Sequence, residues 1–346
     1  MFNSSFRGAS LPLALVGASL GLALAGCGGG GTNLPTPGSG QGTLGGGNGN
    51  GGPRVDNNTI VFVSTRDGNP EIYSINANGT NPKRLTTNSV TDEQPSRSTD
   101  GSNIVFSSQR DGNPEIYKMN SDGSSVVRLT NDVSVADAPR DTNPVFSPDG
   151  SKIVWQSTRA ASPGGTPVRR LYIMDATGAN QRPVSFADEN QASFDGSWSP
   201  DNVRLLGFLV NPNDTNTNDL AVITPGDATT GAGATANIIR AGTRAAHARY
   251  SPAGARIVLS DATATGQGQL QLLNSDGTLI GAGPSGGVDQ SNPSFNPQGT
   301  RIVWDARTAT GQNRQLYVSD TVTGSTQPAG VAITSEGENY QASWTQ

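Results

Sequence analysis

The sequence has little of what many catalytic and metal sites need, because it contains one Cys and one His among 346 residues. A disulfide framework and a Cys-ligated structural zinc are therefore excluded, as is any site that requires two histidines. Charged residues make up 15% of the chain and the net charge is −5, whereas an average globular chain has about 25% charged residues. Without a basic excess, we expect no binding of nucleic acid through its phosphates.

Glycine and proline are abundant instead, with 45 and 22 residues. Both residues favour turns and are unfavourable inside helices. The composition therefore indicates short strands joined by many turns.

The first 26 residues are typical of a targeting segment rather than of a folded domain. Arg7 is followed by an apolar run from Leu11 to Leu24, which at about 14 residues is too short for a membrane span of about 20. The run ends in Leu24-Ala25-Gly26-Cys27, which resembles the lipobox of bacterial lipoproteins. The resemblance implies cleavage before Cys27, acylation of Cys27 and a lipid anchor in the bacterial cell envelope, on the periplasmic side of the outer membrane or at the cell surface. An ordinary secretory signal with a chance Cys is the alternative.

Residues 27–53 are rich in glycine and show no apolar periodicity. We interpret them as a linker, because such a composition cannot form a core. About 26 flexible residues span roughly 28 Å. The linker therefore allows the domain expected at 54–346 to stand clear of a membrane.

The rest of the chain repeats itself, since the segment 60–73 returns almost unchanged as 104–117. Each unit combines aromatic or β-branched runs with Pro-Asp-Gly and Asp-Gly turns, the pattern of a four-stranded antiparallel meander. One such sheet has two apolar faces and buries both only between neighbours. We therefore predict an all-β, six-bladed β-propeller over 54–346. One anchor residue marks the innermost strand of each blade, namely Arg97, Phe146, Trp198, Tyr250, Phe295 and Trp344.

The two ends of this domain are incomplete in a complementary way. The unit beginning at Thr59 has no anchor strand before it, and Tyr340–Trp344 has no unit after it. We expect the C-terminal strand to complete the first blade and close the ring. Trp344 should then lie beside Ile60.

The repeat resembles the TolB-type, WD-like propeller repeat. The resemblance rests on Phe-Ser-Pro-Asp-Gly, on Ser-x-Arg-Asp-Gly-Asn-x-Glu-Ile-Tyr and on Asp-Gly-x-x-x-x-Arg-Leu-Thr, and it loosens after the second unit. It implies a propeller that binds partners on one face or in its central channel. The chain is similar only to the propeller half of TolB, because the Gly-rich segment stands where TolB has an α/β domain.

Repeat symmetry places one polar residue per blade at one mouth of the channel. These channel-mouth candidates are Gln94, Asn143, Asp195, His247, Asn292 and Gln341. One interpretation is that they cap the entries of strands and bind water. The other is that they contact a ligand or peptide.

The Arg-Asp-Gly-Asn loops should share a face with the connections between blades. We list as candidates for partner contact on that face Arg66, Asp67, Asn69, Arg110, Asp111, Asn113, Glu93, Asp141 and Asp289. Oxygen ligands for calcium are weakly indicated at Asp67, Glu71, Asp111 and Glu115. An ordinary turn, with Arg66 and Arg110 paired to the Asp of their own loops, is the alternative.

No motif for catalysis fits its expected context. Gly283–Gly287 matches Gly-x-Ser-x-Gly, but a nucleophile elbow needs a helix after it, and Pro284 with three glycines indicates a loop. We therefore predict a non-enzymatic, monomeric envelope module that binds proteins or peptides, with no cofactor. A carbohydrate or small-ligand binder, assisted by calcium, is the alternative.

Overall fold

The computed structural model describes residues 58–344, except 132–138, 160–167, 189–190, 212–213, 215, 228–229, 231, 263–265, 310–311 and 322–326. The predictions of a signal peptide, of lipid on Cys27 and of a linker over 27–53 lie outside the described residues. Within the described ranges every regular element is a β-strand. No helix there is long and apolar enough to cross a membrane.

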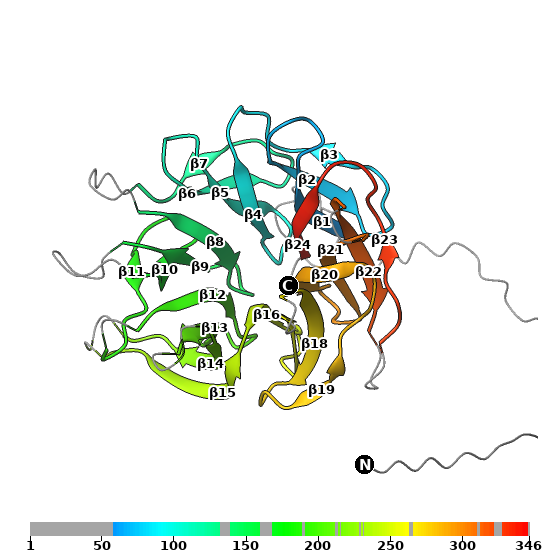
Figure 1. The fold of residues 1–346 in the computed structure, drawn as a ribbon. Helices are drawn as coiled ribbons and strands as arrows, with labels where there is room; N and C mark the ends of the chain where they lie inside the picture. Colours follow the sequence, from blue (N-terminus) through cyan, green and yellow to red (C-terminus); the bar gives the residue numbers. More distant parts are fainter. Residues whose placement is uncertain are drawn as a thin grey trace, which may run out of the picture. The chain divides into compact units, whose positions relative to one another are not determined.

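Three blades come from the first part of the chain and its last strand (Figure 1). From the axis outward, the first blade consists of β24 (Asn339–Trp344), β1 (Thr59–Ser64), β2 (Glu71–Asn76) and β3 (Lys83–Arg84). The second consists of β4 (Asp92–Arg97), β5 (Asn103–Ser108), β6 (Glu115–Asn120) and β7 (Val127–Arg128). The third consists of β8 (Asp141–Phe146), β9 (Lys152–Ser157), β10 (Arg170–Asp175) and β11 (Arg182–Pro183).

The remaining three blades follow in chain order and complete the ring. The fourth consists of β12 (Ser193–Trp198), β13 (Leu205–Val210), β14 (Asn218–Thr224) and β15 (Thr235–Thr243). The fifth consists of β16 (Ala245–Tyr250), β17 (Arg256–Ala262), β18 (Gly268–Asn274) and β19 (Leu279–Ala282). The sixth consists of β20 (Val288–Phe295), β21 (Arg301–Arg307), β22 (Arg314–Asp320) and β23 (Val331–Ala332). The predicted six-bladed propeller is confirmed.

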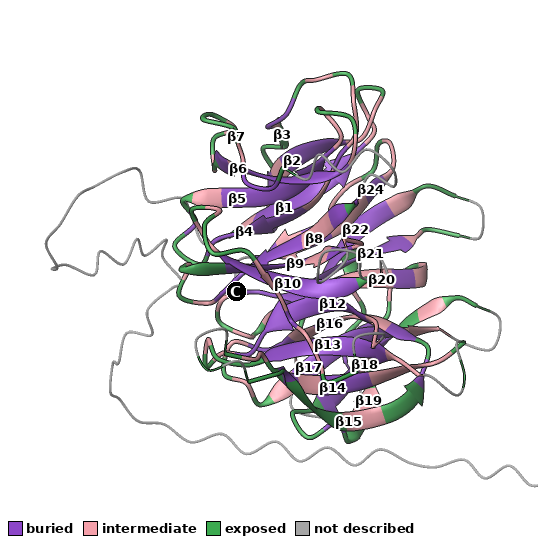
Figure 2. Cartoon of the chain, turned by 90° about the vertical axis from the view of Figure 1, so that its left-hand side faces the viewer, coloured by how far each residue is buried: buried purple, intermediate pink, exposed green. Residues whose placement is uncertain are grey.

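The core is divided into six apolar clusters, one between each pair of neighbouring blades. Successive strand residues point to opposite faces of a sheet, so each blade contributes to the cluster on either side of it. Figure 2 shows the buried strands stacked in this way and the exposed residues at their ends and outer edges. The four tryptophans of the chain are all among the largest fully buried side chains. The fold therefore depends on blade-to-blade packing rather than on one central core.

The C-terminal strand closes the ring as predicted. β24 pairs antiparallel with β1, with Trp344 opposite Ile60 and Ser343 opposite Val61. Trp344 is buried in the cluster between the first and sixth blades. The polypeptide thus locks its two ends together through a pairing between residues far apart in sequence.

Tight turns hold neighbouring blades in contact on one face of the ring. In the turn between β6 and β7, Gly123 has a φ of 93°, and a Cβ there would lie 2.6 Å from the carbonyl oxygen of Leu85 in the first blade. No side chain fits at that distance, so the Asp-Gly motif serves both turn geometry and blade contact. We call the opposite face, where the inner strands begin, the rim face.

Candidate functional site

The six channel-mouth candidates lie where each inner strand bulges. Their φ angles are all positive, between 50° and 57°, and the pairing of each inner strand with its neighbour shifts register around them. Asn, Asp and His tolerate this left-handed conformation better than most residues. The prediction that these residues cap strand entries is corrected: they lie within the strands, and the bulge explains much of their polarity.

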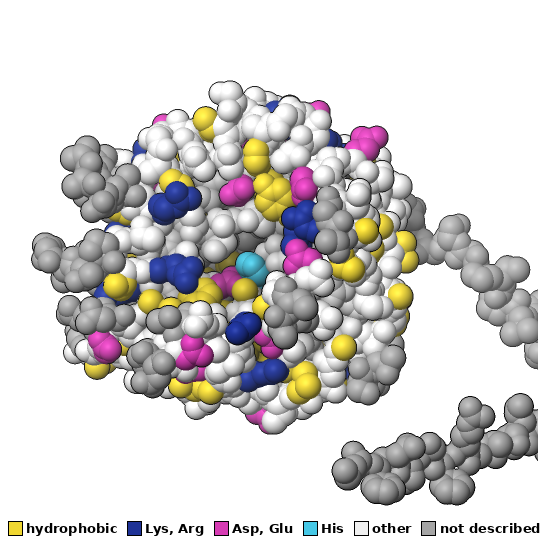
Figure 3. Space-filling model, in the orientation of Figure 1, with side chains coloured by type: hydrophobic (Ala, Val, Ile, Leu, Met, Phe, Trp, Pro, Cys, Tyr) yellow, Lys and Arg dark blue, Asp and Glu magenta, His cyan; other side chains and the backbone are white. Residues whose placement is uncertain are grey.

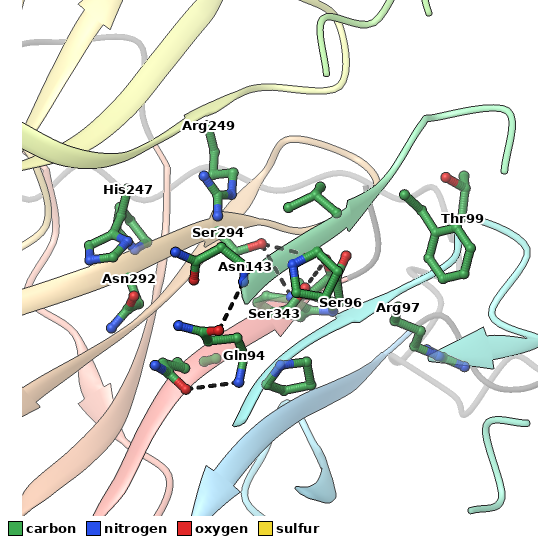
Figure 4. A pocket seen from close by; sticks show the side chains of 18 residues that line it. Gln94, Ser96, Arg97, Thr99, Asn143, His247, Arg249, Asn292, Ser294 and Ser343 are labelled. Carbon is green, nitrogen blue, oxygen red and sulfur yellow. Dashed lines mark hydrogen bonds between the residues drawn. The ribbon is translucent and has the colours of Figure 1, made fainter. Parts of the chain in front are cut away.

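Side chains of this ring bind the backbone of the following blade. The N–H of Gln94 donates to Oε1 of Gln341 (2.9 Å), and the N–H of Asn143 donates to Oε1 of Gln94 (2.8 Å). Likewise, the N–H of His247 donates to the carboxylate of Asp195. These bonds, visible in part in Figure 4, make the mouth a partly closed ring. The polar ring therefore has a structural role that the sequence-based ligand hypothesis did not include.

A sixth-blade carboxylate completes one link of this ring. Asp305 in β21 accepts bonds from the amide of Asn292 (2.8 Å) and from the N–H of Gln341 (2.9 Å), while Arg314 pairs with its other oxygen (2.7 Å). Burial raises the pKa of Asp305, although Arg314 opposes that shift. Sequence analysis missed Asp305 because it lies on the second strand of its blade.

The only histidine belongs to a charged group at the mouth. Nδ1 of His247 lies 3.2 Å from Oδ2 of Asp195, and the guanidinium of Arg249 lies 3.7 Å from Oδ1. Burial alone would raise the pKa of Asp195, but His247 and Arg249 together hold it below the ordinary value. Figure 3 shows this histidine at the centre of the rim face, beside acidic side chains.

The channel behind the mouth is narrow. Its cavity has a volume of about 50 Å³ and is lined by residues of the inner strands, including Arg249, Ser294 and Ser343 (Figure 4). A water needs about 10–15 Å³ by this measure, so the cavity holds a few waters. It is far smaller than typical ligand pockets of about 300–1,000 Å³.

The arginines of the repeated loops do not pair with the Asp of their own loops, which corrects that interpretation. Arg66 donates to Oδ1 of Asn339 (3.0 Å), and Arg110 pairs with Asp92 (3.0 Å). Both partners are the first residues of inner strands. Each arginine also covers two rings of its blade; Arg110 lies 4.7 Å from the ring centroid of Tyr117. This clamp stiffens the loop against its blade.

The weak calcium candidates are occupied by protein donors. Arg84 pairs with Glu71 (2.8 Å), and Tyr73 donates to Asp67. The second blade repeats this with Arg128 on Glu115 (2.7 Å) and Tyr117 on Asp111. Asn69 and Asn113 donate to the same two glutamates (3.2 Å each). Within the described ranges, no three His, Cys, Asp or Glu side chains gather as metal ligands do. These contacts do not favour a calcium site.

The other acidic candidates differ in exposure. Asp141 is buried and paired with Arg159, so its place among residues exposed for partner contact is corrected. Glu93 is half-buried and accepts a bond from the hydroxyl of Tyr340 (3.1 Å). Asp289 is half-buried and pairs with Arg314. Only some of the predicted acidic face is therefore available to a partner.

Two aromatic side chains beside the mouth were not singled out from the sequence. Each precedes a bulge residue: Tyr340 on β24 and Phe194 on β12, in blades on opposite sides of the ring. The guanidinium of Arg169, an exposed residue, lies 4.2 Å from the ring centroid of Phe194, which is buried. Their position directly before a channel-mouth candidate was the signal in the sequence that could have identified them.

The Gly283–Gly287 loop is a connection between blades, as predicted. It lies between β19 and β20, so no helix follows Ser285. Its backbone is used in packing, because the carbonyl of Gly286 accepts a bond from the indole of Trp304 (3.3 Å). The loop lacks the geometry of a nucleophile elbow.

The comparison with known families agrees with this architecture. Residues 44–140 match the family model of the TolB beta propeller domain. The resemblance to the TolB-type propeller repeat is confirmed over this segment. No curated protein matches its sequence significantly.

Solved structures show the same fold at low identity. TolB from Acinetobacter baumannii is 16% identical with a TM-score of 0.63, over 83% of this chain and 66% of that one, slightly less than two thirds of its length. A putative TolB from Agrobacterium tumefaciens is 18% identical with a TM-score of 0.59, over 82% and 90%. A puromycin hydrolase mutant complexed with PGG is 15% identical with a TM-score of 0.54, over 81% and 52%. The fold therefore occurs in enzymes and in TolB proteins alike.

Proposed function

We propose that this protein is a non-enzymatic module of the bacterial cell envelope, anchored through lipid on Cys27, and that it binds a protein partner over the rim face. The observation that carries the proposal is the small channel, of about 50 Å³, behind a mouth whose polar groups largely bind one another. Such a site has little room for a sugar or a small organic ligand. The rim face instead offers a broad surface to a macromolecule.

The composition of that surface supports a protein partner. Aromatic side chains and arginine are enriched at the centres of protein interfaces. Tyr340 with Glu93, and Arg169 with Phe194, lie on opposite sides of the mouth. A standard interface buries about 800 Å² per partner, so one partner spanning the mouth would contact Tyr340 with Glu93 on one side and Arg169, which covers the buried Phe194, on the other.

Crosslinking in intact cells followed by mass spectrometry tests the rim face. We expect charge reversal by Glu93→Lys or Arg169→Glu to remove the partner crosslinks. Asp122→Lys, an exposed site in the β6–β7 turn on the opposite face, should retain them. Equal crosslinking by all three variants, or binding of the wild-type protein to a glycan array, would contradict the proposal.

The anchor is tested separately. Metabolic labelling with a radioactive fatty acid should mark the wild-type protein and not Cys27→Ser. The variant should leave the membrane fraction. A labelled or membrane-bound Cys27→Ser protein would show that the N-terminal segment is not a lipoprotein signal.

A further inference from the structure

The outermost strand of the fourth blade differs from its five counterparts. Four of the other outer strands have 2 residues and β19 has 4, whereas β15 has 9. β15 is hydrogen-bonded to β14 on one side and is the last strand of its sheet (Figure 1). Figure 2 shows it as one of the most exposed strands. Its outer edge therefore presents backbone groups over an unusual length.

The first four residues of this edge, Thr235–Ile238, contain no proline, charged residue or register shift, which are features that protect edge strands in many proteins. β15 reads Thr-Ala-Asn-Ile-Ile-Arg-Ala-Gly-Thr, and its one charge, Arg240, lies 3.6 Å from Asp261. Pairing with β14 is regular from Thr235 to Ile238 and shifts register beyond that point. Each residue of the regular stretch is also exposed. These four residues form the accessible part of the edge.

A groove runs beside the same four residues. It has a volume of about 730 Å³ and lies between β15 and the turns of the fifth blade, with Ile238, Tyr250 and Asp276 among its lining residues. Ile238 is 50% exposed. The hydroxyl of Tyr250 makes no hydrogen bond within the described part of the chain. The groove thus offers an aliphatic contact and a polar one to side chains that project from a neighbouring strand.

The charge of the groove indicates the kind of segment that fits. Asp201 is paired with Arg204 (2.7 Å). Asp276 is exposed and has no ion-pair partner among the described residues, and hydrogen bonds from Thr278 lower its pKa, so it is ionised. The whole chain has a net charge of −5, which attracts basic segments and repels a second copy.

We propose that β15 and this groove bind an extended, basic segment of another protein, which adds to the fourth blade as a fifth strand. Backbone hydrogen bonds to Thr235–Ile238 hold the segment. Its alternate side chains enter the groove, where an aliphatic residue contacts Ile238 and a lysine or arginine lies near Asp276. This site is separate from the rim face and does not depend on the function proposed for it.

A displayed library of random nine-residue peptides tests the site. The library is first depleted on Ile238→Lys and then selected on the wild-type protein. Selected clones should carry basic residues and alternating β-branched residues. Synthetic peptides from these clones should bind at least tenfold more weakly to Ile238→Lys, and Asp276→Asn should reduce the preference for basic peptides.

Two controls make the result decisive. Val331→Lys changes another exposed aliphatic residue, on the two-residue strand β23, and should leave binding unchanged. Methylation of alternate backbone nitrogens of the peptide should abolish binding, because it removes the donors that strand addition needs. No surviving clone, equal binding by the methylated peptide, loss of binding in Val331→Lys, or a β15-dependent dimer in sedimentation would each overturn the proposal.

Discussion

The first three blades and the last three differ in the contacts made by one buried position of the inner strand. The position two residues before the bulge residue of each inner strand is buried in all six blades, at Asp92, Asp141, Ser193, Ala245, Gln290 and Asn339. In the first three blades an arginine from the loop after the second strand reaches this residue, as Arg110 reaches Asp92. The other three blades place Ser193, Ala245 and Gln290 there, with other neighbours.

The residues at this position in the last three blades each have different neighbours. The hydroxyl of Ser193 accepts the N–H of Leu171 (3.1 Å), and the amide oxygen of Gln290 accepts the N–H of Leu270 (3.0 Å), each from the preceding blade. Ala245 needs no polar partner and packs in the cluster between the fourth and fifth blades. The comparison shows that burial of this position is general, whereas its chemistry varies. Apolar packing between blades is the element that all six share.

The largest expected effect tests that shared packing. Trp344→Ala should lower the free energy of unfolding by about 3–5 kcal/mol, because it empties a buried site in the ring-closing cluster. Val331→Ala, at an exposed position, should change it by less than about 0.5 kcal/mol. Urea unfolding followed by circular dichroism measures both. Similar costs for the two variants would show that closure by β24 contributes little.

The next effect compares two nearly identical loops. Arg110→Ala should lower the free energy of unfolding by about 2–3 kcal/mol, because it leaves the buried carboxylate of Asp92 without its cation. Arg66→Ala should cost about 1 kcal/mol, because its partner Asn339 is neutral. Denaturant midpoints of the two variants decide this. Equal losses would mean that the contacts of each arginine with the aromatic rings contribute more to stability than the charge of its hydrogen-bond partner does.

A pH series separates the two buried carboxylates at the mouth. The pKa of Asp195 is lower in the folded state, so its contribution to stability is present above the ordinary Asp pKa of about 3.9 and is lost as the pH falls toward the folded value. Asp195→Asn should therefore lower the free energy of unfolding by about 1–2 kcal/mol at pH 7, and the loss should become progressively smaller below pH 4.

Asp305 should show the opposite trend. Its pKa is raised in the folded state, so the wild-type protein gains stability relative to Asp305→Asn as the pH falls through that raised value. Urea unfolding at several pH values measures both differences. Parallel trends for the two variants would contradict the assigned directions.

The smallest effect concerns the polar ring. Gln94→Ala removes the acceptor for the N–H of Asn143. It should lower the free energy of unfolding by about 1 kcal/mol. Thermal unfolding should show a decrease of about 2–4 °C. An unchanged melting temperature would mean that water replaces the side chain at no cost.

Much of the architecture could be predicted from the sequence, because each blade is a local unit. The recurrence of 60–73 at 104–117, the aromatic anchors and the Asp-Gly turns together indicate strand number, blade number and the pairing of Trp344 with Ile60. The six mouth residues were also found by repeat symmetry. Their bulged backbone was not, because the left-handed conformation arises only where an inner strand bends around the channel.

Side-chain partners were predicted less well. Pairing of Arg66 with the Asp of its own loop was one interpretation, and Asp141 was a candidate for partner contact. Both instead contact residues that the sheet register brings together, Asn339 and Arg159. The length of β15 was also missed, because its apolar residues do not belong to the repeated motif.

The strands, the turns and the number of blades can be read from the amino-acid sequence, because alternation and turn chemistry act over a few neighbouring residues. Which buried groups meet, and how wide the channel is, depends on the assembled ring. Those outcomes depend on how six sheets stack around an axis, where Arg66 meets a residue 273 positions away. No local pattern specifies such a contact, since both side chains would suit other partners until the ring closes.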